Sequence, residues 1–346
     1  EPPMTLLEVT DLHVGFPTPD GVVHAVRGVS FAVEAGRTLA VVGESGSGKS
    51  VATQTVTGLT RGAQISGSAV FDGEDLLTAT TKQLEAVRGA RIGMIFQDPL
   101  TSLHPYYTVG WQIVEMIRAH DRGISRRAAR RRAVELLALV GIPQADLRVD
   151  DYPHQFSGGM RQRAMIAMSI ALDPALLIAD EPTTALDVTV QAQILTVLQD
   201  VQRELGTAII LITHDLGVVA EVADEIVVMY AGQVMERAAR HELFYRFHHP
   251  YTEGLLASLP SRAPGRGRLT PIPGSPPSLI TPPEGCPFRP RCAYAFDRCT
   301  QTPWLAPVFG RSDHESACWL PSDIASRDER VASREARVTS PHEQPA

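Results

Sequence analysis

The sequence contains no long hydrophobic segment. None of its apolar runs approaches the roughly 18–20 residues that a helix needs to span a bilayer. Its beginning also lacks the charged residues followed by an apolar run that are typical of a signal peptide. Together these two absences predict a cytosolic protein.

An excess of positive charge is also missing. The 346 residues carry a formal net charge of −7, which argues against a nucleic-acid partner bound over the whole surface. The 44% hydrophobic and 21% charged residues are ordinary for folded domains and exclude a disordered or fibrous protein. At this length we expect about two domains. One arginine-rich run, residues 122–132, is interpreted as a solvated helix face.

Strand and helix signals alternate from Leu6 to about Gly232. Short apolar runs bounded by loops predict buried strands of a parallel sheet: TLAVVG, RIGMIFQ, ALLIADE, AIILITH and EIVVMYAG. Two earlier segments, LLEVTDLHVGF and HAVRGVSFAVEAG, alternate like half-exposed antiparallel strands. Helices are expected to follow Lys49, Thr108, Ser125, Ser157 and Val188. The predicted fold class is α/β, a mixed sheet with an antiparallel β subdomain and a helical insertion at about residues 98–172.

Composition divides the chain into three parts. Residues 4–258 carry the strand and helix pattern and form the predicted main domain. Eight prolines between Pro260 and Pro283 then indicate an extended linker or wrapped arm, which opens a C-terminal segment at 259–320. The final residues, 321–346, are polar, and we expect a loose tail there.

A phosphate-binding loop is the clearest motif. GESGSGKS fits G-x-x-x-x-G-K-S and stands between an apolar strand and a helical run, the context that this motif requires. Its glycines let backbone N–H groups converge on phosphates at the positive end of the following helix. We expect Lys49 to reach the β- and γ-phosphates and Ser50 to bind Mg²⁺. The predicted ATP-binding residues of this motif are Gly43, Glu44, Ser45, Gly46, Ser47, Gly48, Lys49, Ser50 and Val51.

Polar residues end three of the predicted buried strands. ALLIADEP places Asp180 where its carboxylate can bind Mg²⁺ and Glu181 where it can polarise a water for attack on the γ-phosphorus. Gln97, which we expect to meet metal and water, and His214 end two further strands. Because open α/β sheets bind ligands at the carboxyl ends of their strands, we predict catalytic roles for Glu181, His214 and Gln97.

A second glycine motif, HQFSGGMRQR, also stands at a helix start. The phosphate loop and the strand ends can surround one nucleotide without Ser157, Gly158 and Gly159. Two chains packed head to tail would use them, because each could offer this helix start to ATP held on its partner. The alternative is an ordinary helix with Ser157 at its N-cap.

Taken in order, these motifs resemble the nucleotide-binding subunit of ABC transporters. FSGGM stands where LSGGQ is commoner in that family, and the resemblance extends from about Leu6 to Gly254. It implies a P-loop NTPase cassette with a RecA-like mixed sheet, and His214 as the family's switch histidine. It also implies that the Ala185–Asp187 turn brings Asp187 to the nucleotide and that Phe16 stacks on adenine.

Within that family the chain is similar to the ATPases of oligopeptide and dipeptide importers. The segments that carry this resemblance are GESGSGKSV, IFQDPLTSLHP, YPHQFSGGMRQR and HHPYTEGLLASLP. It implies two transmembrane permeases, a second and distinct ATPase subunit, and an extracytoplasmic solute-binding protein, with this chain on the cytoplasmic membrane face. QDPLTSLHP and the helical insertion would receive a helix of the permease.

Other members of the family set the alternatives. Nickel or glutathione stays open as the cargo. A soluble ABC ATPase acting on ribosomes or DNA is disfavoured, because the chain holds one cassette and no long heptad run.

Cysteine is scarce, and all four residues lie beyond position 285: Cys286, Cys292, Cys299 and Cys318. No C-x-x-C pair is present, so the spacing alone does not indicate zinc. Disulfides are not expected in a reducing cytosol. The importer resemblance implies a four-iron, four-sulfur cluster, with zinc and empty thiols as the alternatives. Arg289, Arg291 and Arg298 would offset thiolate charge, and His314 is a spare ligand.

Overall fold

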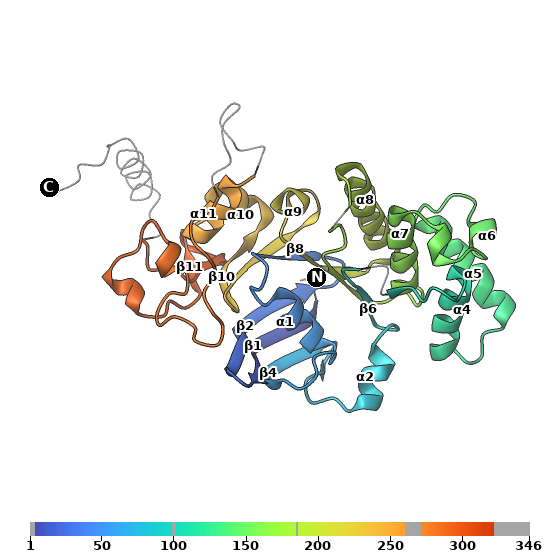
Figure 1. The fold of residues 1–346 in the computed structure, drawn as a ribbon, viewed down its shortest axis with the longest axis horizontal. Helices are drawn as coiled ribbons and strands as arrows, with labels where there is room; N and C mark the ends of the chain where they lie inside the picture. Colours follow the sequence, from blue (N-terminus) through green and yellow to red (C-terminus); the bar gives the residue numbers. More distant parts are fainter. Residues whose placement is uncertain (1–3, 99–101, 185, 260–270, 322–346) are drawn as a thin grey trace.

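The computed structural model describes residues 4–98, 102–184, 186–259 and 271–321. Two sheets form its centre, one antiparallel with the order β2-β1-β4-β5 and one mixed with the order β11-β12-β10-β9-β3-β8-β7-β6. The antiparallel sheet consists of β1 (Thr5–Thr18), β2 (Gly21–Glu34), β4 (Gln64–Phe71) and β5 (Glu74–Asp75). It lies beneath the larger sheet, with α1 (Lys49–Val56) in contact with β1 and β2 (Figure 1).

The predicted buried strands form the parallel part of the large sheet. They are β3 (Thr38–Val42), β6 (Ile92–Ile95), β7 (Leu176–Asp180), β8 (Ala208–Thr213) and β9 (Glu225–Tyr230). Every residue of β3, β7 and β8 is buried, which explains why these strands read as continuous apolar runs. The prediction of a mixed sheet with an antiparallel β subdomain is confirmed.

The helical insertion forms the right-hand part of the molecule in Figure 1. It contains α4 (Val109–His120), α5 (Arg126–Leu139), α6 (Ala145–Arg148) and α7 (Gly158–Ser169), and α8 (Val188–Leu205) packs against α7. Thr108, Ser125 and Ser157 accept a backbone N–H at the starts of α4, α5 and α7. The helices predicted after Lys49, Thr108, Ser125, Ser157 and Val188 are all present, and a side chain caps each of them except α1, which begins after Gly48.

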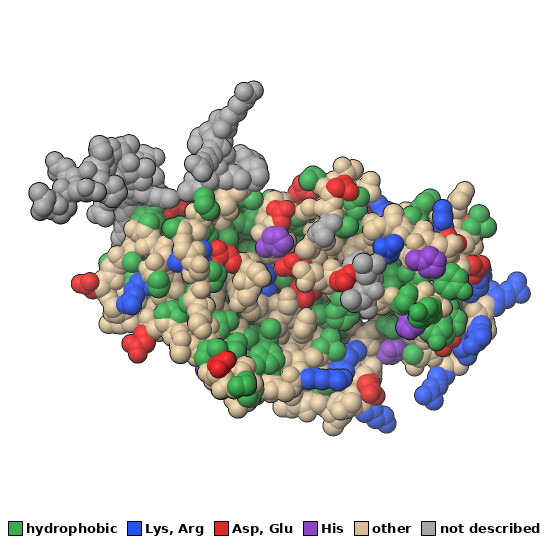
Figure 2. All heavy atoms as spheres, in the orientation of Figure 1, with side chains coloured by type: hydrophobic (Ala, Val, Ile, Leu, Met, Phe, Trp, Pro, Cys, Tyr) green, Lys and Arg blue, Asp and Glu red, His purple; other side chains and the backbone are tan. Residues whose placement is uncertain are grey.

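The arginine-rich run lies on the outer face of this insertion. Lys and Arg side chains gather at the right-hand end of the molecule (Figure 2). All five arginines between 122 and 131 are exposed. Arg130 pairs with Asp150 at 2.7 Å, and Arg126 lies 3.7 Å from Glu115. These exposed ion pairs agree with a solvated helix face.

The remaining helices cover the cassette on its other sides. They are α2 (Thr81–Val87), α9 (Leu216–Val222), α10 (Arg240–Arg246) and α11 (Pro250–Ala257). Short 3-10 turns occur at Pro153–Gln155, Arg289–Arg291 and Asp297–Thr300. No helix in the described residues is both long and apolar enough to cross a membrane.

The C-terminal segment is an extension of the large sheet rather than an arm alone. After β10 (Gln233–Ala239), the strands β12 (Arg311–Ser316) and β11 (Ala306–Val308) add to the sheet edge. Cys286, Phe288 and Cys299 pack into one apolar cluster with residues of α9, α10 and α11. The sequence pattern predicted no strand in this segment.

Candidate functional site

The phosphate loop connects the end of β3 to the start of α1. Gly43, Gly46 and Gly48 have φ values of 154°, 78° and 95°. A Cβ at Gly43 would lie 2.1 Å from the Met229 carbonyl oxygen, and one at Gly48 would lie 2.3 Å from the Ala25 carbonyl oxygen. Both positions therefore require glycine, because the loop backbone lies directly against neighbouring backbone.

Lys49 begins α1 and lies inside this loop. Its ammonium donates to the carbonyl oxygens of Gly43 at 2.7 Å and Glu44 at 2.9 Å, and only 4% of the residue is exposed. Burial lowers the pKa of Lys49, against the opposing effect of Glu181, Asp180 and Glu44. The loop thus holds a buried cation where phosphate charge would meet it.

Ser50 and Asp180 lie together at the predicted magnesium site. The Ser50 hydroxyl donates to Asp180 Oδ1 at 2.7 Å, and Gln54 Nε2 donates to Asp180 Oδ2 at 3.4 Å. Burial raises the pKa of Asp180, and the neighbouring Glu181 raises it further, while the hydrogen bonds oppose both. A hydroxyl and a carboxylate are oxygen ligands of the kind that Mg²⁺ prefers, so these residues fit that ion.

Glu181 follows β7 and is the centre of the predicted catalytic group. Its Oε2 accepts from Gln97 Nε2 at 3.1 Å and from the Thr184 hydroxyl at 2.8 Å. Its Oε1 lies 3.5 Å from His214 Nδ1. The structure therefore brings together the three predicted catalytic side chains, which come from the ends of three neighbouring strands.

Two residues of this site were missed by the sequence analysis. Thr184 holds one oxygen of Glu181, and Gln54 contacts Asp180 from the second turn of α1. Thr184 stands three residues after Glu181, and this short spacing was the signal that its hydroxyl could contact the carboxylate. The prediction that Gln97 also binds Mg²⁺ stays a prediction, since its amide donates to Glu181.

The second glycine motif begins α7, which packs against α4, α5, α8 and β6, whereas α1 contacts β1 and β2. The Ser157 hydroxyl accepts from the Met160 N–H at 3.3 Å, so Ser157 caps α7, which is compatible with both interpretations of the motif. Ser157 and Gly158 are exposed, and a Cβ on Gly158 would meet no atom within 4 Å. This open helix start stays a predicted site for a partner's ATP.

The remaining predicted nucleotide contacts are not tested by the geometry. Asp187 caps α8 by accepting from the N–H groups of Thr189 at 3.1 Å and Val190 at 3.0 Å. Phe16 is half-buried on β1 and packs against the core of the antiparallel sheet. Ala185 of the predicted turn lies outside the described residues, as do residues 99–101 of QDPLTSLHP.

Comparison with known proteins agrees with this geometry. A family model described as ABC transporter matches residues 26–184, and one described as the C-terminal region of oligopeptide/dipeptide transporters matches residues 235–299. The oligopeptide transport ATP-binding protein OppD of Bacillus subtilis is 54% identical, over 91% of this chain and 88% of the relative. The chain belongs to the ATP-binding subunits of ABC transporters.

Further relatives and solved structures support the same assignment. The dipeptide transport ATP-binding protein DppD of Bacillus subtilis is 49% identical to this ABC ATPase, over 91% of the chain and 94% of the relative. A dimeric structure of a bacterial ABC transporter cassette is 26% identical with a TM-score of 0.62, covering 68% of this chain and 98% of that one. The predicted ABC-type cassette and its ATPase activity are thereby confirmed.

The four cysteines of this ABC ATPase line one cavity of about 10 Å³ together with Phe288 and Trp319. All four are free thiols. Burial raises the pKa of Cys292 and of Cys318 to about 12, and it also raises the pKa of Cys286. Without a bound metal ion the neutral form of these three thiols is therefore favoured, and binding of a metal ion would deprotonate them.

The expected metal centre is not seen among the described residues, although the four cysteines line one cavity. No group of three or more His, Cys, Asp or Glu side chains in the described part of the chain could hold a metal ion. Of the arginines predicted to offset thiolate charge, Arg291 pairs with Glu44 and Arg298 lies over the Trp319 ring. The predicted spare ligand His314 is instead fully buried against Glu236 at 2.8 Å.

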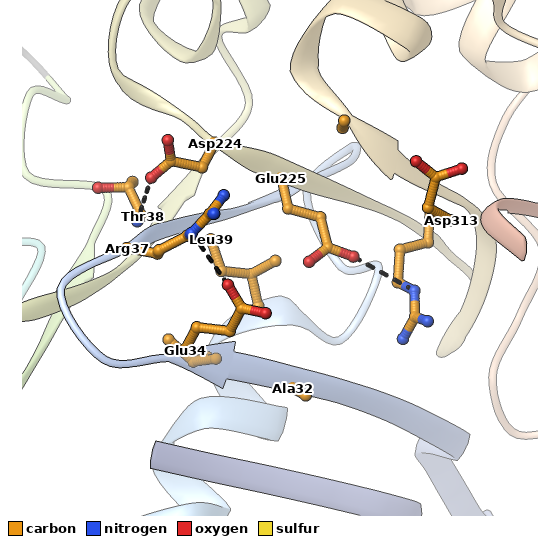
Figure 3. A pocket seen from close by; sticks show the side chains of 11 residues that line it. Ala32, Glu34, Arg37, Thr38, Leu39, Asp224, Glu225 and Asp313 are labelled. Atoms are coloured by element: carbon orange, nitrogen blue, oxygen red, sulfur yellow. Dashed lines mark hydrogen bonds and ion pairs between the residues drawn. The ribbon is translucent and has the colours of Figure 1, made fainter. Parts of the chain in front are cut away.

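A separate polar cavity of about 250 Å³ lies where β3 begins, at the edge of the sheet opposite the phosphate loop (Figure 3). Carboxylates that line this cavity already form hydrogen bonds or ion pairs within the chain. Asp224 accepts from the Thr38 N–H at 2.8 Å, and Glu225 lies 3.3 Å from Arg237. Since the phosphate loop follows the other end of β3, this cavity is not part of the ATP site.

Proposed function

We propose that this chain is an ATP-hydrolysing motor subunit of an importer for oligopeptides or dipeptides, bound peripherally to the cytoplasmic face of the membrane. The complete catalytic group around Glu181 carries the proposal, because it occurs in a chain 54% identical to an oligopeptide transport ATP-binding protein. The match of residues 235–299 to the oligopeptide/dipeptide C-terminal region supports the cargo class.

The proposed mechanism places ATP on the phosphate loop. Backbone N–H groups between Gly43 and Ser50 and the Lys49 ammonium bind the phosphates, and Ser50 and Asp180 bind Mg²⁺. The bound ion, when present, supplies positive charge to the phosphate oxygens. Glu181 accepts the proton of a water whose oxygen bonds to the γ-phosphorus, while the bond to the β–γ bridging oxygen breaks and releases ADP and phosphate. Gln97, Thr184 and His214 hold that carboxylate in place.

ATP would also join two cassettes. Ser157 and Gly158 present an exposed helix start that a phosphate on a second subunit can occupy. Closure of the pair would bind ATP between them, and hydrolysis would release it. We propose that the second subunit is a distinct ATPase, as the resemblance to oligopeptide and dipeptide importers implies.

The permeases would bind at the helical insertion. Tyr107 and Trp111 stack at 4.0 Å between ring centroids, and both are exposed, as is Tyr106. A helix of a permease seated on these rings would respond to movement of Gln97, which links the insertion to the catalytic carboxylate. An extracytoplasmic solute-binding protein would deliver the cargo to those permeases.

The iron–sulfur cluster is retained only as a proposal from the importer resemblance. The placement of all four cysteines around one cavity supports it. Anaerobic purification followed by iron, sulfide and zinc analysis decides between a cluster, zinc and empty thiols.

Transport by the assembled importer tests the proposed function. We would capture the chain from solubilised native membranes, identify the permeases and second ATPase that co-purify, and reconstitute them in proteoliposomes. ATP-dependent uptake of peptides, absent with Glu181→Gln, is the expected result. Uptake of nickel or glutathione, and not of peptides, would show that the proposed cargo is wrong. Capture of ribosomal or DNA-bound proteins without permeases would refute the proposal that the chain belongs to an importer.

A further inference from the structure

An ion pair joins the C-terminal segment to the phosphate loop. Arg291 Nη1 donates to Glu44 Oε2 at 2.6 Å, and Arg291 Nη2 donates to Glu44 Oε1 at 2.9 Å. The two residues are 247 positions apart, and the Arg291 side chain is 4% exposed. Such two-point contacts between guanidinium and carboxylate fix orientation as well as charge.

Other groups of the cassette hold the same pair in place. The Tyr251 hydroxyl accepts the backbone N–H of Glu44 at 2.8 Å, and the Tyr230 hydroxyl accepts from Arg291 Nη1 at 3.2 Å. Arg291 Nε donates to the Pro273 carbonyl oxygen at 2.8 Å. Because the guanidinium is bound on several sides, it cannot swing away from Glu44 without breaking these contacts.

Glu44 in turn holds the part of the loop that binds phosphate. Its carbonyl oxygen accepts from Lys49 Nζ at 2.9 Å and from the Ser47 N–H at 3.2 Å. The Glu44 hydrogen bond raises the pKa of Arg291, so the guanidinium stays charged. Without that cation, a Glu44 carboxylate would stand unpaired beside the phosphates of ATP and repel them.

We propose that Arg291 is a positioning residue of the ATP site. It cancels the charge of Glu44 and fixes the Glu44 backbone that holds Lys49. The C-terminal segment therefore sets the affinity of the cassette for ATP, in addition to any role it has in the importer.

Nucleotide binding and turnover by the full-length chain test this role. Arg291→Gln should raise both the Kd of a fluorescent ATP analogue and the KM for ATP by at least about tenfold, which corresponds to about 1.4 kcal/mol, while kcat changes little. Arg291→Lys keeps the charge but loses the two-point contact, and it should lie between wild type and Arg291→Gln. The matched control is Arg298→Gln, which removes a cation lying over Trp319 in the same segment and should leave ATP affinity unchanged.

A second substitution separates this role from simple stabilisation of the fold. Arg291→Gln combined with Glu44→Gln should bind ATP more tightly than Arg291→Gln alone, because the unpaired carboxylate is gone. A lower Tm with unchanged KM in Arg291→Gln would overturn the proposal, as would a loss confined to kcat. If Arg291→Gln does not fold, Arg291→Lys alone carries the test, and a wild-type KM in that variant would also overturn the proposal.

Discussion

The amide nitrogen of Gln97 lies 3.1 Å from Oε2 of Glu181. Gln97 follows β6 and Glu181 follows β7, and these two strands are parallel neighbours in the large sheet. The Thr184 hydroxyl donates to the same oxygen at 2.8 Å, so the orientation of the carboxylate depends on both Gln97 and Thr184. A movement of the helical insertion that displaces Gln97 would therefore break a hydrogen bond to the catalytic carboxylate of Glu181.

Glu181→Gln should bind ATP normally and hydrolyse it at least about 100-fold more slowly, because the amide cannot accept the proton of the attacking water. Phosphate release measures the rate, and light scattering with ATP should detect a lasting closed dimer. Glu85→Gln on the exposed face of α2 is the matched control and should behave like wild type. Wild-type turnover in Glu181→Gln would remove Glu181 from the role of base.

Lys49→Ala should weaken ATP binding by at least about tenfold, because a buried ammonium that faces the phosphates is lost. Isothermal titration with a slowly hydrolysed ATP analogue gives the Kd. Lys82→Ala, an exposed lysine on α2, is the control. An unchanged Kd in Lys49→Ala would exclude Lys49 from the phosphate site.

Gly158→Ala separates the two interpretations of the second glycine motif. A Cβ at Gly158 meets no atom within 4 Å, and the residue has no positive φ, so Tm should not fall. The added methyl would nevertheless stand where a partner's phosphate approaches the helix start. In the Glu181→Gln background, ATP-driven dimer formation should be lost while ATP binding by the single chain persists. Normal dimer formation would leave the motif as a helix cap alone.

Much of the fold could be predicted from local signals. The apolar runs marked the buried strands, and Ser125 and Ser157 marked helix starts because a capping side chain acts within three residues. The catalytic group was predictable because polar residues at the ends of parallel strands converge at one edge. Each of these signals lies within one short stretch of sequence.

The C-terminal segment was not predictable in this way. β12 has the polar sequence RSDHES, and it is a strand only because it pairs with β10, where Glu236 lies opposite Ser316. The Arg291–Glu44 contact joins positions 247 residues apart, and no local pattern indicates it. The arginines beside the cysteines suggested charge compensation, whereas the folded chain uses Arg291 at the phosphate loop.

The buried pair of Glu236 and His314 connects β10 of the cassette to β12 of the C-terminal segment. Their side chains lie 2.8 Å apart with 0% exposure, and Glu236 also accepts the N–H groups of His248 at 2.5 Å and His249 at 3.0 Å. Burial by itself raises the pKa of Glu236, but the hydrogen bonds from His314 and His248 bring it below its usual value.

The stability that Glu236 contributes should therefore depend on pH. Because its pKa is lower in the folded than in the unfolded chain, this stability is present above the unfolded pKa of about 4.3 and is lost as the pH falls through the folded value. Glu236→Gln should lower the free energy of unfolding by roughly 3 kcal/mol at pH 7, since it leaves buried partners without a carboxylate. The difference in Tm from wild type should shrink below about pH 4. Asp313→Asn, which alters an exposed pair with Arg311, should shift Tm far less at pH 7. An equal Tm difference at pH 7 and below pH 4 would show that Glu236 acts through packing rather than through its charge.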